Sequence, residues 1–425
     1  MSPTDEPTIA VDGDAPEAAA PQKVGGLFLT LFGLMNFGLY LTVMMPALFS
    51  LPYKVQLLAP DSKASVLGMV ATVGAIVSIL TGPLAGVLSD QTRSRWGRRR
   101  PWLLGGILVV LAGSLIVASA ASVPVLLLGW MVVCAGGGGV GAAITPVVAE
   151  RVPEAQRGTV GAIVGVATQL AGVLGYTIGG LLTGSLILLF VLPIAVLAVF
   201  ALVYSLVFPD STAPVEKVSV GETFRMLVFD PRKHRDFSLV WLGKLLMQTS
   251  LAFLTTYQLY FLADRLGFTA EEAGQRLALV GGIGILVTMG FAVTSGILSD
   301  RMRRRKLFVV TSSVLTAVGL TLMAFTDGFG LFFAAVMFVL GAAGMFGSTD
   351  VAMASDLVPE RDKAGRWMAT YNLAATLSGA IAPMLGAGLL ALNDPTGGNY
   401  TALFLAGAVI ALGTGAVTLL IRGVR

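Results

Sequence analysis

Hydrophobic runs of about 20 residues follow one another along the chain from residue 24, separated by short polar or charged segments. Each run is long enough for a helix that crosses the hydrocarbon core of a bilayer. A helix satisfies its own backbone hydrogen bonds inside lipid, so runs of this length predict transmembrane helices. We predict twelve spans, at roughly residues 24–52, 64–89, 101–120, 123–149, 158–183, 185–208, 237–262, 272–299, 306–326, 329–357, 364–391 and 400–421.

Composition supports the same class. The chain is 55% hydrophobic and 12% charged, with a mean hydropathy of +0.84, which is too much apolar surface for a water-soluble core. We predict an all-α, multi-pass protein of the cell (plasma or inner) membrane. The sole histidine, His234, lies in a charged loop and the sole cysteine, Cys134, lies within a span. We therefore expect no metal site, no cofactor and no enzymatic activity.

Polar segments divide the chain into four parts. Residues 1–22 are rich in Ala, Pro and acidic residues and lack the basic start of a secretory signal, so we predict a disordered cytoplasmic tail. Residues 209–236 form the longest internal polar segment, and we predict a cytoplasmic linker there. It would join a six-helix bundle at 23–208 to a second six-helix bundle at 237–425.

The cations fall mostly on one side of the predicted membrane. Lys and Arg are retained in cytoplasmic loops, and the alternate loops that include 92–100, 301–306 and 361–366 hold most of them. The other loops hold only Lys54, Lys63, Arg265 and Arg276. Both termini are therefore predicted to be cytoplasmic. The net charge of +4 is then a topology signal, and we expect no nucleic-acid partner.

Two motifs occur once in each half. Gly86-Val-Leu-Ser-Asp90 and Gly296-Ile-Leu-Ser-Asp300 each end a span and are followed by a cluster of arginines. Residues 150–158, after the fourth span, match residues 356–365, after the tenth, in an acid followed by Pro-Glu and a cation. The chain is therefore predicted to be an internal duplication.

Duplicated six-span halves with these two motifs resemble the major facilitator superfamily, whose halves rock around a central site to give alternating access. The resemblance covers residues 24–422. Within that superfamily, residues 94–101, with Gly97 seven residues after Asp90, are similar to the sucrose and glycoside-pentoside-hexuronide cation symporters. The resemblance implies a secondary active transporter of a small solute.

The motif residues suit a cytoplasmic gate. Gly86 and Gly296 would allow close helix approach, and a carboxylate that ends a span can cap a neighbouring helix or pair with arginine. The resemblance implies that Asp90 would face the start of span 11, and Asp300 the start of span 5, when the cytoplasmic side is sealed. The alternative is that the arginines only anchor the loops. The gate residues we predict are Asp90, Arg95, Arg98, Glu150, Arg157, Asp300, Arg304, Asp356 and Arg366.

Charges within the spans are rare, because each costs about 2.5–3.5 kcal/mol on insertion scales. Lys244 in span 7 and Asp350 in span 10 lie at similar depth, roughly 12 Å from the cytoplasmic end. Spans 1, 4, 7 and 10 line the cavity in the resembling superfamily, which implies that the two meet. They would then form either a permanent packing pair or a proton-coupling pair, because burial and a nearby ammonium shift carboxyl protonation in opposite directions.

Polar side chains within the spans are candidates for solute contact, because amides bind hydroxyl pairs and aromatic faces stack on sugar rings. Span 7 carries a polar stripe at helical spacing. We predict contacts from Asn36, Tyr40, Gln248, Thr255, Tyr257 and Gln258. For Gln169, Tyr371 and Asn372 we expect hydrogen bonds between neighbouring helices instead.

The chain departs from the sugar symporters in one respect. Spans 1 and 2 contain no carboxylate, and span 4 has none before Glu150, so a melibiose-type sodium site is not expected. Proton coupling through Asp350 and uncoupled facilitated diffusion both remain open. We predict a monomeric, proton-coupled carrier of a glycoside or oligosaccharide. The alternative is a proton-driven exporter of drugs or secondary metabolites, favoured by the missing acids and by sixteen methionines that could line an adaptable cavity.

Overall fold

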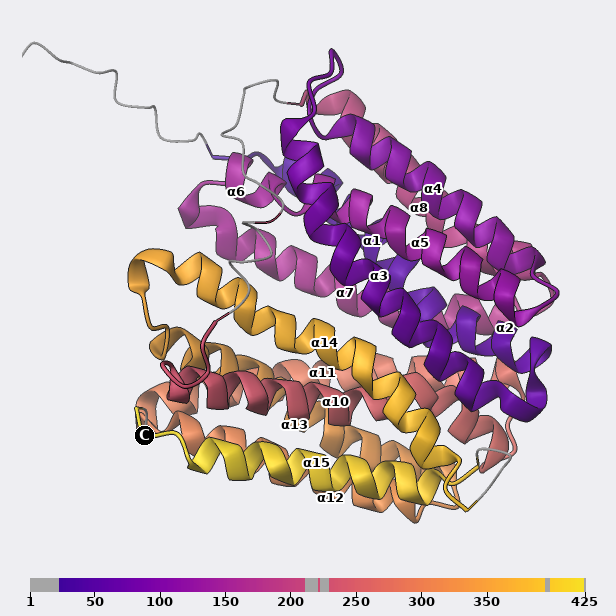
Figure 1. Ribbon diagram of the computed structural model, residues 1–425, viewed down its shortest axis with the longest axis vertical. Coiled ribbons are helices and arrows are strands. Elements are labelled where there is room, and N and C mark those ends of the chain that lie inside the picture. Colours follow the sequence, from indigo (N-terminus) through magenta and orange to yellow (C-terminus); the bar gives the residue numbers. More distant parts are fainter. Residues whose placement is uncertain (1–22, 211–220, 222–228, 394–397, 424–425) are drawn as a thin grey trace, which may run out of the picture.

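The computed structural model describes residues 23–210, 221, 229–393 and 398–423, and its long elements are α-helices (Figure 1). Within these residues, twelve helical segments are long and apolar enough to cross a membrane, as the sequence predicts. The predicted tail at 1–22 and most of the predicted linker lie outside the described residues.

The first six spans are built from α1 (Gly26–Met45), a π-helical turn η1 (Pro46–Ser50), α2 (Leu51–Leu58), η2 (Pro60–Ser62), α3 (Lys63–Gln91), α4 (Arg100–Ser119), α5 (Val123–Ile144), α6 (Val147–Arg151), α7 (Glu154–Leu181) and α8 (Leu186–Val207). The last six are α10 (Arg235–Asp264), α11 (Ala270–Met302), α12 (Arg305–Ala324), α13 (Phe329–Asp356), α14 (Ala364–Leu390), preceded by η3 (Arg361–Lys363), and α15 (Tyr400–Leu419).

The two groups of six helices repeat the same packing. In the N-terminal half α5 packs on α3 and α4, and α1 packs on α7 and α8. In the C-terminal half α13 packs on α11 and α12, and α10 packs on α14 and α15. Helices at equivalent places therefore have equivalent neighbours, which confirms two pseudo-symmetric six-helix halves. Many large apolar side chains remain exposed on the outer surface, as lipid-facing helices require.

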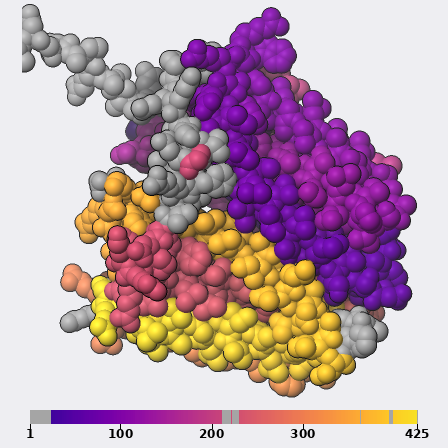
Figure 2. Space-filling model, viewed as in Figure 1, coloured from indigo at the N-terminus to yellow at the C-terminus, as the bar shows by residue number. Residues whose placement is uncertain are grey.

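The two ends of the bundle differ. One end, here called the basic end, carries the arginine-rich turns between α3 and α4 and between α11 and α12; the other is called the opposite end. The halves meet where α3 packs on α14 and α7 packs on α11, and they abut along a diagonal boundary (Figure 2). At the opposite end the backbones come close: a Cβ on Gly68 would lie 2.7 Å from the Pro383 carbonyl oxygen, and one on Gly274 would lie 3.0 Å from Gly180 Cα.

The first span is longer than predicted. Proline has no backbone N–H to donate within a helix, and the π-helical turn η1 accommodates this change in hydrogen bonding. Neither Pro46 nor Pro52 therefore ends the helix, which continues to Leu58. Lys54, predicted in a loop, is therefore in the span. It is 6% exposed, and its Nζ donates to the Ala118 carbonyl oxygen at 3.0 Å, at the C-terminal end of α4. Pro146, in contrast, does interrupt the fourth span, which divides into α5 and α6.

Candidate functional site

Three side chains from three helices of the C-terminal half meet in its interior. Asp350 of α13 is 1% exposed, and the hydroxyl of Tyr371, on α14, donates to its Oδ2. Lys244 of α10 places its Nζ 3.6 Å from the centroid of the Tyr371 ring, a cation–π contact. Tyr371 belongs to a cluster of buried hydrophobic residues that includes Met247 and Phe346. A buried carboxylate in such surroundings requires a polar partner, and Tyr371 supplies it.

Lys244 and Asp350 are thus connected through Tyr371. Among the ion pairs of the described residues, none joins Lys244 directly to Asp350 within 4.0 Å. The sequence predicts a hydrogen bond between helices for Tyr371, and the structure shows one. Its position between the two charges was missed, because the sequence does not show that α14 lies beside both α10 and α13.

The predicted solute contacts differ in their surroundings. On α1, Asn36 is buried and its Nδ2 donates to the Phe32 carbonyl oxygen at 2.8 Å, while Tyr40 is half-buried. On α10, Gln248 is half-buried and Thr255 is exposed. Three of these four therefore keep some accessible surface in this conformation.

Tyr257 and Gln258 have protein partners instead. Tyr257 is fully buried and its hydroxyl donates to the Pro383 carbonyl oxygen at 2.5 Å. Gln258 Nε2 donates to the hydroxyl of Tyr176 on α7, so this bond crosses between the halves. Both residues lie in the closely packed opposite end. A solute contact from either would require these hydrogen bonds to break. Of the other polar residues in the spans, Gln169 and Asn372 are exposed.

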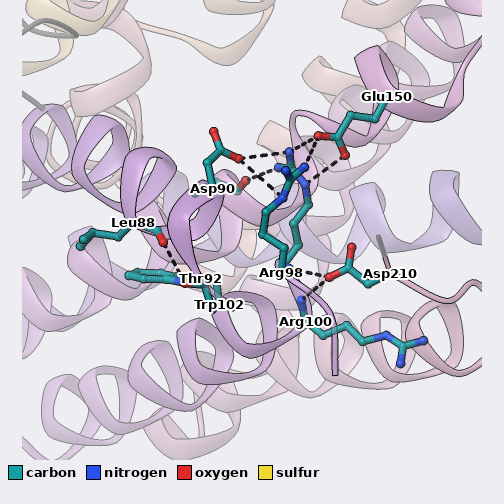
Figure 3. Close-up of polar contacts among 10 residues, drawn as sticks. Leu88, Asp90, Thr92, Arg98, Arg100, Trp102, Glu150 and Asp210 are labelled. Carbon is teal, nitrogen blue, oxygen red and sulfur yellow. Dashed lines mark hydrogen bonds and ion pairs between the residues drawn. The ribbon is translucent and has the colours of Figure 1, made fainter. Parts of the chain in front are cut away.

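The basic end carries a cluster of ion pairs in each half. In the N-terminal half, Arg98 Nη2 lies 2.5 Å from Glu150 Oε1, and Arg99 Nε donates to Glu150 Oε2 at 3.2 Å (Figure 3). Arg99 Nη2 also lies 3.4 Å from Asp90 Oδ1. Both arginines are almost fully buried, at 5% and 6% exposed. The turn after α3 is therefore fastened to the ends of α3 and α6.

The C-terminal half repeats this arrangement with Arg305. Its Nη2 lies 3.4 Å from Asp300 Oδ1, and its Nη1 pairs with Asp356 and donates to the Ala352 carbonyl oxygen at 2.6 Å. The sequence singles out the neighbouring Arg304, but Arg305 makes these pairs. It begins α12, where its side chain can reach both acids.

The resemblance implies contacts between the halves when the cytoplasmic side is sealed, from Asp90 to the start of span 11 and from Asp300 to the start of span 5. In this conformation the two acids have other partners. Asp90 and Asp300 pair within their own halves, as described above. Arg157 Nη1 lies 3.3 Å from Glu154 Oε1. Arg366 Cζ lies 5.7 Å from the ring centroid of Trp367, and Arg95 Cζ lies 6.0 Å from that of Trp96. The ion pairs and hydrogen bonds that join described residues of the two halves lie at the opposite end.

Asp210, directly after the sixth span, is a functional candidate that the sequence analysis missed. Its Oδ2 accepts from the backbone N–H of Arg99 at 2.5 Å and of Arg100 at 3.2 Å, and so caps the start of α4 (Figure 3). Gly97 permits this approach, with a φ of +101°. Gly86, in contrast, has no atom within 4 Å of an added Cβ, and Gly296 has only ordinary contacts with Ser348. Neither glycine lies at a close helix approach in this conformation, and their place in a sealed basic end stays a prediction.

Among the described residues, no group of three or more His, Cys, Asp or Glu side chains is placed to hold a metal ion. The site therefore consists of a charged cluster in the interior of one half, polar side chains on α1 and α10, and ion-paired turns at the basic end. Two pseudo-symmetric halves around such groups are the arrangement of a solute transporter.

Comparison with known families identifies the class. A family model described as the Major Facilitator Superfamily matches residues 25–293 and 285–425. The chain belongs to this superfamily and is a multi-pass membrane transporter of a small molecule rather than an enzyme.

Individual proteins match this chain either over a short segment or at low sequence identity. A 45-residue segment is 51% identical to an uncharacterized symporter, sll1374, of Synechocystis sp., and the match spans 11% of this chain and 8% of that protein. The crystal structure of the nucleoside transporter NupG covers 93% of this chain and 98% of its own, with a TM-score of 0.71 and 13% identity. A bacterial homologue of the human lysosomal transporter Spinster, in an inward-facing and unoccupied conformation, covers 93% and 95%, with a TM-score of 0.69 and 16% identity. The likenesses to the two solved structures concern the fold alone.

Proposed function

We propose that this chain is a proton-coupled carrier of a sugar-like solute, a glycoside or oligosaccharide, that works as a monomer by alternating access. The observation that carries the proposal is the cluster of Lys244, Tyr371 and Asp350. A carboxyl group that is 1% exposed in an apolar interior is retained at a cost of several kcal/mol in order of magnitude, unless it is paired or neutral. Reversible proton binding at Asp350 would explain why a carboxyl group is kept at this buried position.

The arrangement of the cluster supports coupling over simple packing. A permanent structural pair would bring ammonium and carboxylate into direct contact, whereas here Tyr371 stands between them, with its hydroxyl on Asp350 and its ring against Lys244. A movement of α10 relative to α14 would change the distance between the two charges. Gain or loss of a proton at Asp350 would, in turn, change the attraction that Lys244 feels.

Orientation follows from the positive-inside rule. The basic end would face the cytoplasm, with both termini inside, and the carrier would lie in the plasma or inner membrane. The conformation described here would then be closed on the outer side, where the halves make their hydrogen bonds and closest contacts. In the alternate state, Asp90 and Asp300 would exchange partners and join the halves at the basic end.

The solute class is proposed from side-chain chemistry and from the resemblance to the sucrose and glycoside-pentoside-hexuronide symporters. Asn36 and Gln248 offer amides, and Tyr40 offers an aromatic face, on the two helices α1 and α10. NupG is a nucleoside transporter by name, and a nucleoside is itself a glycoside of ribose, so nucleosides belong among the solutes to be tested.

The test is uptake of a panel of sugars, glycosides and nucleosides into proteoliposomes, with and without an inward proton gradient. The expected result is accumulation of at least one solute that requires the gradient and is lost in Asp350→Asn. Asp327→Asn, which neutralises an acid whose side chain is 86% exposed between α12 and α13, is the matched control and should accumulate solute normally. Undiminished accumulation by Asp350→Asn would remove Asp350 from the mechanism. Gradient-driven export of a dye, with no response to any member of the panel, would favour the exporter.

A further inference from the structure

One ion pair between described residues crosses from one half of the protein to the other. Lys63, at the start of α3, donates to Oδ1 of Asp264, the last residue of α10. The other ion pairs between described residues each stay within one half. Lys63 and Asp264 lie at the opposite end, where the halves are in closest contact.

Both partners of this pair are held in place by tyrosines. The Tyr400 hydroxyl, from α15, donates to Asp264 Oδ2 at 2.6 Å, so the carboxylate is fixed within its own half. The Lys63 ammonium also lies 5.1 Å from the ring centroid of Tyr260, which is one turn before Asp264 on α10. The Tyr260 hydroxyl donates to the Pro52 carbonyl oxygen of α2 at 2.8 Å. The end of α10 is therefore joined to the N-terminal half at two successive turns.

The surroundings make this pair stronger than an open surface pair. The Lys63 side chain is 13% exposed and that of Asp264 is 31% exposed, so water screens the pair only in part. The backbone contacts of Gly68 with Pro383 and of Gly180 with Gly274 lie at the same end. The halves cannot part at this end unless Lys63 separates from Asp264.

We propose that the Lys63–Asp264 pair is the latch that holds the opposite end closed, and that Tyr260 and Tyr400 are its positioning residues. Each transport cycle would break the pair as the opposite end opens and form it again as that end closes. The proposal depends on alternating access in this superfamily and is independent of the solute and the coupling ion.

The test measures how often the opposite end opens. Cys134 is replaced by serine, and Ala387→Cys is introduced as the reporter, because Ala387 is 5% exposed and its Cβ faces Gly68. The probe is a membrane-impermeant maleimide, applied to the reconstituted protein on the side of the membrane that the opposite end faces. Lys63→Gln and Asp264→Asn should each raise the labelling rate about fivefold, the factor expected for the upper range of a partly exposed ion pair. The exchanged double variant, Lys63→Asp with Asp264→Lys, should return it to within about twofold of the parent.

The Arg265–Asp327 pair is the matched control. It lies at the same end, with 3.2 Å between Arg265 Nη2 and Asp327 Oδ1, but both residues belong to the C-terminal half. Arg265→Gln should leave the labelling rate unchanged. A rise equal to that of Lys63→Gln, or unchanged labelling in both latch variants, would overturn the proposal, as would failure of the exchanged pair to restore closure. Ala273→Cys, fully buried at the start of α11, provides a second reporter. A carrier that proves uncoupled from protons would leave these expectations in place.

Discussion

Gly97→Ala tests how the arginine-rich turn of the N-terminal half is built. Gly97 has a φ of +101°, a region that side chains with a Cβ avoid, and an added Cβ would lie 2.6 Å from Asp210 Cγ. Alanine therefore strains the backbone by about 1–3 kcal/mol. It also displaces Asp210 from the N–H groups of Arg99 and Arg100, and the loss of such a cap costs about 1 kcal/mol. The expected total destabilisation is about 2–4 kcal/mol.

The assay is thermal unfolding of the purified protein in detergent, followed by the fraction that remains monodisperse in size-exclusion chromatography. Gly86→Ala, eleven residues earlier in the same motif, is the control. Gly86 is helical and has no atom within 4 Å of an added Cβ, so alanine should stabilise the helix by about 0.5–1 kcal/mol. The two variants should shift the unfolding temperature in opposite directions. Equal shifts, or wild-type stability for Gly97→Ala, would refute the account of this turn.

Three further substitutions separate structural from transport roles. Tyr371→Phe removes the hydroxyl that donates to Asp350 but keeps the ring beside Lys244. It should lower gradient-driven accumulation at least about tenfold, because hydrogen bonds to charged groups contribute about 1.5–3 kcal/mol. Normal accumulation would contradict a coupling role. Tyr257→Phe should lower the unfolding temperature and leave KM for the solute unchanged, whereas a raised KM would indicate that Tyr257 contacts the solute. Glu150→Gln leaves Asp90 as the remaining acidic partner of Arg98 and Arg99. It should destabilise the protein by about 1–2 kcal/mol in the same thermal assay, a value discounted for the partial exposure of Glu150. Unaltered stability would show that these pairs contribute nothing.

The twelve spans could be predicted because lipid leaves the backbone few alternatives to a helix. The error at Lys54 arose because the first span was predicted to end at residue 52, whereas the helix continues past Pro52 to Leu58 after a π-helical turn, which has no clear pattern in sequence. The depth of Lys244 and Asp350 followed from the helical rise. Their connection through Tyr371 did not, because it depends on which helices are neighbours.

The contacts between the halves at the opposite end could not be predicted from the sequence. Lys63 and Asp264 are 201 positions apart, and neither belongs to a repeated motif, so each is an ordinary loop charge until the halves are assembled. The repeated motifs drew attention to the basic end instead. There the four predicted acids pair with Arg98, Arg99 and Arg305, whereas the sequence singles out Arg98 and Arg304, and these pairs lie within each half rather than across it.

The most direct test of the central claim is whether protons move together with the solute. Proteoliposomes in a lightly buffered medium, with no imposed gradient, are supplied with a solute that the panel has identified, and the external pH is recorded beside solute uptake. The account expects the medium to become more alkaline in step with uptake, and expects Asp350→Asn to exchange solute without any pH change. Solute uptake by the wild type with no change in pH, or an undiminished pH change in Asp350→Asn, would contradict it.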